Sequence, residues 1–377
     1  MNTDGEELIA DLLDGIVDSL DVPDEMLERT QNLYDDVGEF MRDDLPDDSM
    51  WSFRPQGSAN LGTIVLPAPG DEFDIDSVAT WHVREENITK TDLKSTIGNV
   101  LRRYQAAARN PDVPKPTNLD EGRRCWTLEF VEAFHMDVLP SVPDEENPPT
   151  GILLTDKTLQ NWLFSDPEAY ANWFPAQNQT LLYESKGVFA KRAQVDISDV
   201  PNWQVRTMLQ RVVQVLKAHR NCYFADDLDS RPASILVTTL AALAFVNSST
   251  LFASVLETAG HLGNHIECDG GRYFVLNPVQ EKENFADRWT MADAARFSKW
   301  VDALRSNLES ALGVRSGLPG VVESFSAAFN KQAVIKSAKR VGADITGTRW
   351  RGGLLIGASG VVGAGTGITS RDHTFHA

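Results

Sequence analysis

The sequence lacks a basic excess, although it is long enough for two packed lobes. Its 377 residues include 35 Lys and Arg against 54 Asp and Glu, a net charge of -19. Basic side chains that neutralise phosphates supply much of the affinity of proteins for duplex nucleic acid. The acidic balance therefore argues against a large nucleic-acid partner, but it leaves room for a small basic pocket that binds triphosphates.

Cysteines are few, and long apolar runs and a signal peptide are missing. The three cysteines are scattered and odd in number, which favours reduced thiols over disulfides (Cys125, Cys222 and Cys268). The first residues are acidic and carry no positive segment of the kind that begins a signal peptide. The apolar run from Ser234 to Val246 is too short to span a bilayer. We expect a cytoplasmic protein without a membrane partner.

Periodicity predicts an α/β first half. Apolar residues recur at helical spacing over 6–20, and further helices are expected at 24–42 and 91–109. Glycines and prolines punctuate residues 51–81, which is typical of two strands joined by a turn. We expect a loop over 110–120, one long strand over 125–139 and a short strand over 152–154.

The second half reads as mainly helical. The segment 233–245 is apolar on all sides and predicts a buried helix. Two more helices are expected, at 290–312 and 319–340, and the only strand-like interruption is 272–276. The final stretch is rich in Gly, Ser and Thr. We predict a catalytic lobe with N-terminal helices over 1–200, a helical lobe over 201–341 and a flexible tail over 342–377.

Three aspartates in apolar surroundings carry the chemistry. Asp74 and Asp76 alternate along an expected strand, so their carboxylates face the same side, and Asp137 lies on a later strand. Converging carboxylates repel each other, and two Mg²⁺ ions, with Mn²⁺ as a substitute, would cancel that repulsion. The alternative is a solvated acidic loop. The apolar neighbours of these residues, among them Phe73 and Ile75, favour metal ligands.

Gly57 and Ser58 precede the aspartates and could bind phosphate. Glycine lets backbone N–H groups approach a phosphate closely, and the serine hydroxyl adds a donor. A Gly-Ser pair alone is usually an ordinary turn. Its place just before the aspartates favours a nest for the β- and γ-phosphates.

These motifs resemble a known family. Residues 55–76, PQGSANLGTIVLPAPGDEFDID, resemble the nucleotidyltransferase signature of the bacterial cGAS/DncV-like enzymes (CD-NTases) of the DNA polymerase β-like superfamily. FHMDVLPSVPD, at 134–144, resembles that family's third-carboxylate strand, and 207–224 and 231–243 resemble its helical lobe. Glu72 and Asp74 also resemble the Glu-x-Asp of animal relatives, but the Ser-Val that follows Asp76 favours the bacterial register.

The resemblance implies an α+β fold, a mixed-sheet polymerase β-like lobe and a helical lobe with the active site in the cleft between them. It also assigns roles, residue by residue. The metal-binding catalytic carboxylates are Asp74, Asp76 and Asp137, and the substrate-binding residues are Gly57, Ser58, Lys217 and Ser234. Other readings remain for two of these: Lys217 could be a solvated helix lysine, and the Ser234 hydroxyl could serve a helix N-terminus.

The implied activity is synthesis of a cyclic oligonucleotide signal from ATP and GTP in the antiphage defence called CBASS. A cyclic purine dinucleotide such as cGAMP is the first guess, on the resemblance alone. The alternatives are a nucleotidyltransferase that modifies RNA, protein or a small molecule, and a scaffold without catalysis. Some family members lie beside a ubiquitin-like conjugation system, so the tail that ends at Ala377 could bind such a conjugation enzyme; plain disorder is the other reading.

Two weaker signals remain. His261, His265 and Cys268 have a spacing compatible with zinc, but a structural zinc site needs a fourth ligand and a plain helix end is preferred. A basic run on the last expected helix reads as a solvated face rather than a nucleic-acid site (Lys331, Lys336, Lys339 and Arg340).

Overall fold

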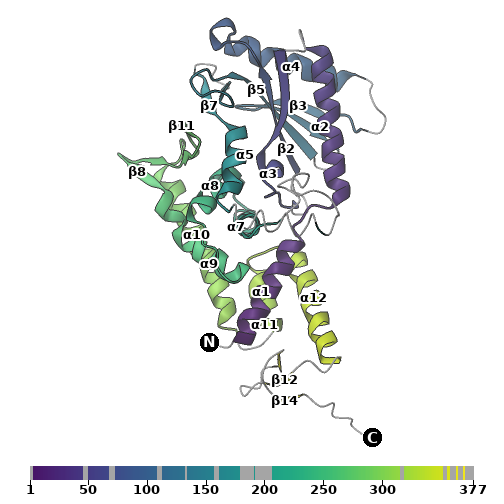
Figure 1. Cartoon of the computed structure of the whole chain (residues 1–377), viewed down its shortest axis with the longest axis vertical. Coiled ribbons are helices and arrows are strands. Elements are labelled where there is room, and N and C mark those ends of the chain that lie inside the picture. The colour runs from purple at the N-terminus through teal and green to yellow at the C-terminus, as the bar shows by residue number, and fades with distance from the viewer. Residues whose placement is uncertain are drawn as a thin grey trace.

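A computed structural model describes most of the chain. The described residues are 3–45, 50–67, 73–107, 113–131, 134–156, 161–178, 191, 206–314 and 318–350, with short pieces at 355–356, 362–363 and 368–369. They form an elongated molecule in which a sheet lobe sits above a helical lobe (Figure 1).

A seven-stranded mixed sheet forms the upper lobe. Its strands are β1 (Trp51–Gln56), β2 (Phe73–Trp81), β3 (Asn118–Glu121), β4 (Trp126–Phe130), β5 (Phe134–Pro143), β6 (Ile152–Leu154) and β7 (Leu163–Ser165). The order is β1-β2-β5-β4-β3, with β6 beside β5 and β7 beside β6. Only β2 and β5 are parallel among these pairs. The predicted α+β class with a mixed sheet is confirmed.

Two helices cover the sheet because each carries an apolar stripe. These helices are α2 (Asp24–Asp44) and α4 (Lys90–Ala106). Leu33 of α2 and Ile97 of α4 are fully buried in one cluster with Met136 of β5. This packing leaves the opposite side of β2 and β5, which carries the aspartates, outside the cluster.

The expected strand over 125–139 is wrong, because the chain forms the antiparallel hairpin of β4 and β5 there. Buried residues fall on even positions both before and after the turn, from Trp126 through Phe130 to Phe134 and Met136. A period of two therefore continues across the turn and hides it. The expected loop over 110–120 also gives way to β3, which begins at Asn118 and pairs with β4. Between β1 and β2 lies a short helix, α3 (Gly57–Asn60), that was not predicted.

The helical lobe gathers segments from both halves of the chain. Its main helices are α7 (Met208–Tyr223), α8 (Ser234–Ala244), α9 (Leu251–His261), α10 (Met291–Leu312), α11 (Leu318–Ser326) and α12 (Lys331–Trp350). They share one core with α1 (Thr3–Asp18) and α5 (Pro167–Ala176). Figure 1 shows α1 beside α12, below the sheet. A lobe boundary at residue 200 therefore does not describe the packing of α1 and α5.

Several boundaries in the helical lobe differ from the sequence prediction. Four short strands replace the one expected: β8 (Glu267–Asp269), β9 (Arg272–Phe274), β10 (Leu276–Asn277) and β11 (Gln280–Asn284). The helix expected at 319–340 is two, because the Asn330 side chain accepts from the N–H groups of Gln332 and Ala333 and caps a new helix. Short 3-10 helices cover Glu85–Asn87, Leu228–Ser230 and Leu262–His265.

The last helix continues beyond the point where the tail was expected. α12 passes Gly342 and ends at Trp350. Three two-residue strands then pair antiparallel: β12 (Leu355–Ile356), β13 (Val362–Gly363) and β14 (Ile368–Thr369). The end of the predicted tail, residues 371–377, lies outside the described residues.

Candidate active site

The aspartates lie on the two parallel strands of the sheet. In the register of β2 and β5, Asp76 stands opposite Asp137 and Asp74 stands opposite His135. Asp74 and Asp76 are two residues apart and face the same side. The Asp74 side chain is 66% exposed, and its Oδ1 lies 2.6 Å from Nε2 of His135. Four ionisable side chains thus form a compact patch, of which sequence analysis missed the histidine.

Burial and repulsion between the carboxylates disfavour negative charge in this patch. Burial, followed by the charges of Asp137 and Asp74, raises the pKa of Asp76 to about 7. The Thr127 hydroxyl donates to Oδ1 of Asp137 at 2.6 Å. Burial, followed by the charge of Asp137, raises the pKa of the Cys125 thiol to about 12. The nearby cysteine therefore stays protonated, and the patch holds more negative charge than the protein itself neutralises.

The donor set fits a hard divalent cation. Asp76 and Asp137 offer carboxylate oxygens side by side, and a cation there would favour the ionised form of Asp76. Asp74 is engaged with His135. Within the part of the chain that the structure describes, no three acidic, imidazole or thiol groups are grouped tightly enough to hold one metal ion. The predicted three-aspartate metal site stays a prediction.

Position 57 requires glycine because the backbone there lies very close to the Asp76 side chain. Its φ of 77° is left-handed, and a Cβ at this position would lie 2.0 Å from Oδ2 of Asp76. Any side chain would collide with the carboxylate. Ser58 follows at the start of α3 and lines the cleft described below. The Gly-Ser pair therefore lies against the carboxylate patch.

Basic side chains of α7 form the opposite wall. Lys217 is 4% exposed, and its Nζ donates to the carbonyl and the hydroxyl of Thr63 at 3.2 and 3.0 Å. Burial, followed by Arg220, lowers the pKa of Lys217 to about 7. Burial, followed by Arg231, lowers the pKa of Arg220 to about 10. Arg220 donates to Oγ of Ser234 at 3.0 Å, which ties the predicted serine to this wall.

A cleft of about 550 Å³ joins the two walls. Its lining includes four of the seven predicted site residues and several that sequence analysis missed (Ser58, Asp74, Lys217 and Ser234, with Thr63, His135, Arg220 and Arg231). Arg220 lies three residues after Lys217 and so shares its helix face, a spacing that the sequence already offered. Thr63 has no such signal, because only the tertiary fold brings it to Lys217.

The weaker signals are not joined to this site. His261 ends α9, His265 lies in the following 3-10 helix and exposed Cys268 is in β8, and no metal-binding group was found among the described residues. Arg340 of the basic run forms an ion pair with Asp18 of α1. Arg340 therefore links α12 to α1.

A mixed sheet with paired aspartates, closed by a helical wall of basic side chains, is the architecture of a nucleotidyltransferase. Residues 51–140 match the family described as "Cyclic GMP-AMP synthase DncV-like, nucleotidyltransferase domain". This match lies in the sheet lobe and agrees with the resemblance to the CD-NTases that the sequence motifs indicate.

Two relatives and a solved structure are similar to the chain over longer stretches. The chain is 32% identical to a c-di-GMP synthase of Roseivirga ehrenbergii over 238 residues, which cover 62% of this chain and 60% of that synthase. It is 25% identical to the cyclic dinucleotide synthase CdnG of Bradyrhizobium diazoefficiens over 358 residues, 85% of this chain and 83% of CdnG. The structure of CdnG in complex with GTP superposes with a TM-score of 0.68 at 20% identity, covering 89% of this chain and 98% of the other.

None of the helices in the described part of the chain combines the length and the apolar character that a membrane span requires.

Proposed function

We propose that this chain is a cyclic dinucleotide synthase that joins two purine nucleoside triphosphates. One observation carries the proposal: paired aspartates on β2 and β5 lie against Gly57 and Ser58, and the cleft beside them has a wall of buried basic groups. The acidic patch suits divalent cations, and the basic wall suits the triphosphate that accompanies them.

The protein groups have separate tasks in this reaction. The backbone of Gly57 and the hydroxyl of Ser58 bind the β- and γ-phosphates, and Lys217 with the Arg220–Ser234 pair binds the triphosphate from the other lobe. Asp74, Asp76 and Asp137 would hold two Mg²⁺ ions, which would neutralise charge on the phosphates and favour ionisation of the attacking hydroxyl.

The bond changes balance without another reactant. A ribose hydroxyl of one nucleotide attacks the α-phosphorus of another, a P–O bond forms and the bond to the β-phosphate breaks, which releases pyrophosphate and one proton. A second, identical step within the linear intermediate closes the ring. Each step requires the α-phosphorus to lie between the acidic patch and the basic wall.

The product remains a proposal. The description of the matched family names a cyclic GMP-AMP synthase, whereas the relative at 32% identity is called a c-di-GMP synthase and CdnG is solved with GTP. We therefore place c-di-GMP first and keep cGAMP as the second candidate. A role in bacterial antiviral signalling is part of the same proposal.

The test is a reaction with radiolabelled ATP and GTP in Mg²⁺, followed by phosphatase treatment and mass spectrometry of the small products. A phosphatase-resistant product of two purine nucleotides is expected. Label on an added RNA, protein or drug would instead indicate a modifying transferase, and absence of turnover would favour a scaffold. Either of these results would overturn the proposal.

The position of α12 supports the partner predicted for the tail. This helix ends at Trp350, at the end of the molecule remote from the sheet (Figure 1). We propose that a ubiquitin-like conjugation enzyme binds the residues that follow. Deletion of 371–377 should leave turnover of the purified enzyme unchanged and reduce its attachment to cellular targets on immunoblots. Loss of turnover in the truncated enzyme would contradict this role.

A further inference from the structure

One residue contacts the phosphate-binding groups of both lobes. The N–H of Thr63 donates to the carbonyl of Ser58 at 3.0 Å. The carbonyl and the hydroxyl of Thr63 accept from Nζ of Lys217 at 3.2 and 3.0 Å. The Thr63 side chain is fully buried, and the residue lines the cleft. Ser58 and Lys217 are therefore connected through a single residue.

The segment that carries Thr63 is itself anchored on α7. Gln210 donates to the carbonyl of Leu61 at 3.0 Å, and Gln214 donates to the carbonyl of Ile64 at 3.0 Å. Gln210, Gln214 and Lys217 occur at helical spacing, so one helix face donates hydrogen bonds to three residues of the segment (Leu61, Ile64 and Thr63).

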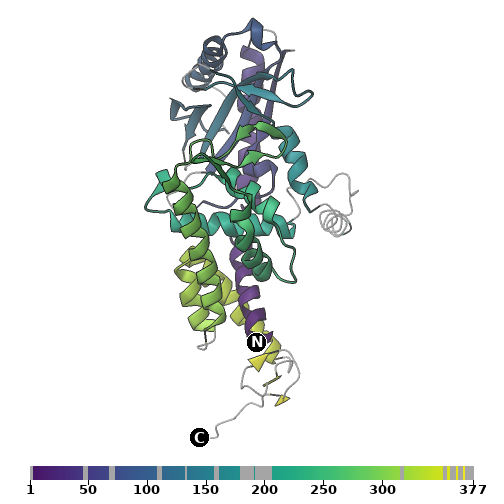
Figure 2. The same cartoon turned by 90° about the vertical axis from the view of Figure 1, so that its left-hand side faces the viewer.

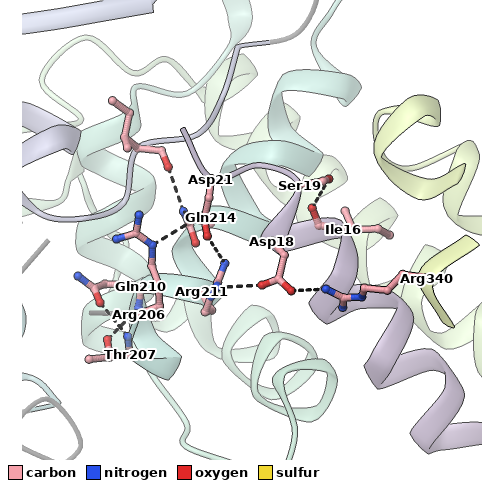
Figure 3. A network of polar contacts seen from close by, with 11 residues as sticks. Ile16, Asp18, Ser19, Asp21, Arg206, Thr207, Gln210, Arg211, Gln214 and Arg340 are labelled. Atoms are coloured by element: carbon pink, nitrogen blue, oxygen red, sulfur yellow. Dashed lines mark hydrogen bonds and ion pairs between the residues drawn. The ribbon is translucent and has the colours of Figure 1, made fainter. Parts of the chain in front are cut away.

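A charged network fixes this face of α7. Figure 3 shows Asp21, which follows α1, between Arg206, Arg211 and Gln214. Each of the three side chains donates a hydrogen bond to the Asp21 carboxylate, with donor–acceptor distances of 3.1 to 3.2 Å. Arg211 also donates to Asp18 at 2.9 Å. The helix that positions Thr63 is therefore held at Arg211 and Gln214 by the end of α1.

We propose that Thr63 is a positioning residue that sets the distance between Ser58 and Lys217 and thereby fits the cleft to a triphosphate chain. This inference rests on the proposed function, because it assigns both partners to the same substrate. An ammonium group has three N–H donors, and Thr63 takes two of those of Lys217. The third donor is the one that the substrate would use.

Pre-organisation gives the arrangement its value. A lysine side chain has four rotatable bonds, and binding a phosphate with a mobile ammonium group costs conformational entropy. Two acceptors from one buried residue remove that freedom before the substrate arrives. Because Thr63 also holds the Ser58 backbone, the two phosphate-binding groups keep one separation.

The test compares Thr63→Val, which has nearly the same shape without the hydroxyl, with Thr63→Ser, which keeps it. Thr63→Val should weaken GTP binding in Mg²⁺, measured by calorimetry, and raise KM by about tenfold with kcat changed less than threefold. Its affinity for GMP should change less than twofold. Thr63→Ser should remain within about threefold of the wild type in both quantities.

Thr155→Val is the matched control. Thr155 is also fully buried, and its hydroxyl has no hydrogen-bond partner among the described residues. This change should leave GTP affinity and KM unaltered. Should Thr63→Val fail to fold, Gln214→Met replaces it, with an expected rise in KM of about threefold because the Ile64 carbonyl loses its donor.

The outcomes separate this inference from the proposed function. Equal GTP affinity in Thr63→Val and wild type, or equal losses in Thr63→Val and Thr63→Ser that follow their thermal stability, would overturn the role of Thr63. GTP binding with the expected pattern but without a cyclic product would leave the positioning role intact and reject the synthase activity. A wild-type protein that does not bind GTP would reject both.

Discussion

The two walls of the cleft carry opposite charges, and the pKa values of their buried groups are shifted in opposite directions. On the sheet, the pKa of Asp76 is raised to about 7, and on α7 the pKa of Lys217 is lowered to about 7. Burial is the first cause of both shifts, and each pushes its group toward the neutral form. The sheet wall lacks cations and the helical wall lacks anions.

The proposed ligand would suit both walls. A metal-bound triphosphate would bring cations to the aspartates and anions to Lys217 and Arg220, so its binding would favour the charged forms of Asp76 and Lys217 together. The walls differ in what holds their side chains in position. The aspartates are fixed by strand register, whereas the basic groups depend on Thr63 and on the packing behind α7.

The largest expected effect comes from the acidic wall. Asp74→Asn with Asp76→Asn should reduce turnover by about 10³-fold or more, because the cations lose two of their three proposed ligands. Metal-free stability at pH 8 should rise by about 2 kcal/mol, because a strained charge is removed. Kinetic assays and thermal unfolding measure the two effects. Asp120→Asn, an exposed aspartate of β3, is the control. Wild-type turnover in the double variant would exclude the mechanism.

The packing that holds α7 in place behind the basic wall can be tested by measuring stability at different pH values. His219 of α7 is buried, its Nδ1 accepts from Nε1 of Trp300 at 3.0 Å, and burial lowers its pKa to about 4 from 6.5. The folded state binds this proton less readily than the unfolded state. The stabilisation of the folded state by neutral His219 is therefore complete above pH 6.5, and it is lost as the pH falls toward and through 4.

The comparison is with His219→Gln, which does not titrate. The stability difference between wild type and this variant should shrink by about 3 kcal/mol between pH 7 and pH 4, measured by urea unfolding. A constant difference across that range would show that the ring is protonated equally in both states.

A smaller effect is expected from the charge of the basic wall. Lys217→Met should raise KM for GTP about 30-fold, since a charge-assisted contact to phosphate is lost. Stability should change by less than about 1 kcal/mol, because removing a buried charge offsets the lost hydrogen bonds. Steady-state kinetics and thermal unfolding check both statements, with exposed Lys299→Met as the control. An unchanged KM would make Lys217 a structural residue.

The smallest effect concerns the helices behind the basic wall. A Cβ on Gly15 of α1 would lie 2.1 Å from Oγ of Ser337 in α12, whereas nothing lies within 4 Å of one on Gly260 in α9. Gly15→Ala should destabilise the protein by about 1–2 kcal/mol, and Gly260→Ala should stabilise it by about 0.5 kcal/mol. Calorimetric melting of both variants decides this. Equal shifts would show that α1 and α12 are not tightly packed.

Sequence analysis predicted the acidic wall better than the basic one, and the reason is physical. The positions of Asp74 and Asp76 follow from a period of two, which is a local property of a strand. Placing Thr63 beside Lys217 requires knowledge that the segment after α3 meets α7 in three dimensions. The same limit explains why the sequence did not show that α1 packs in the helical core, since its apolar stripe does not say what covers it.

The direction of α12 has a practical consequence. Figure 2 shows the start of α1 and the lower end of α12 at one end of the molecule, with the sheet at the other. The protein could be immobilised on a solid support or fused to a reporter through that end without obstructing the entry of nucleotides. The proposed synthase activity would thus suit a surface-bound reactor in which substrate flows past and the product is collected downstream.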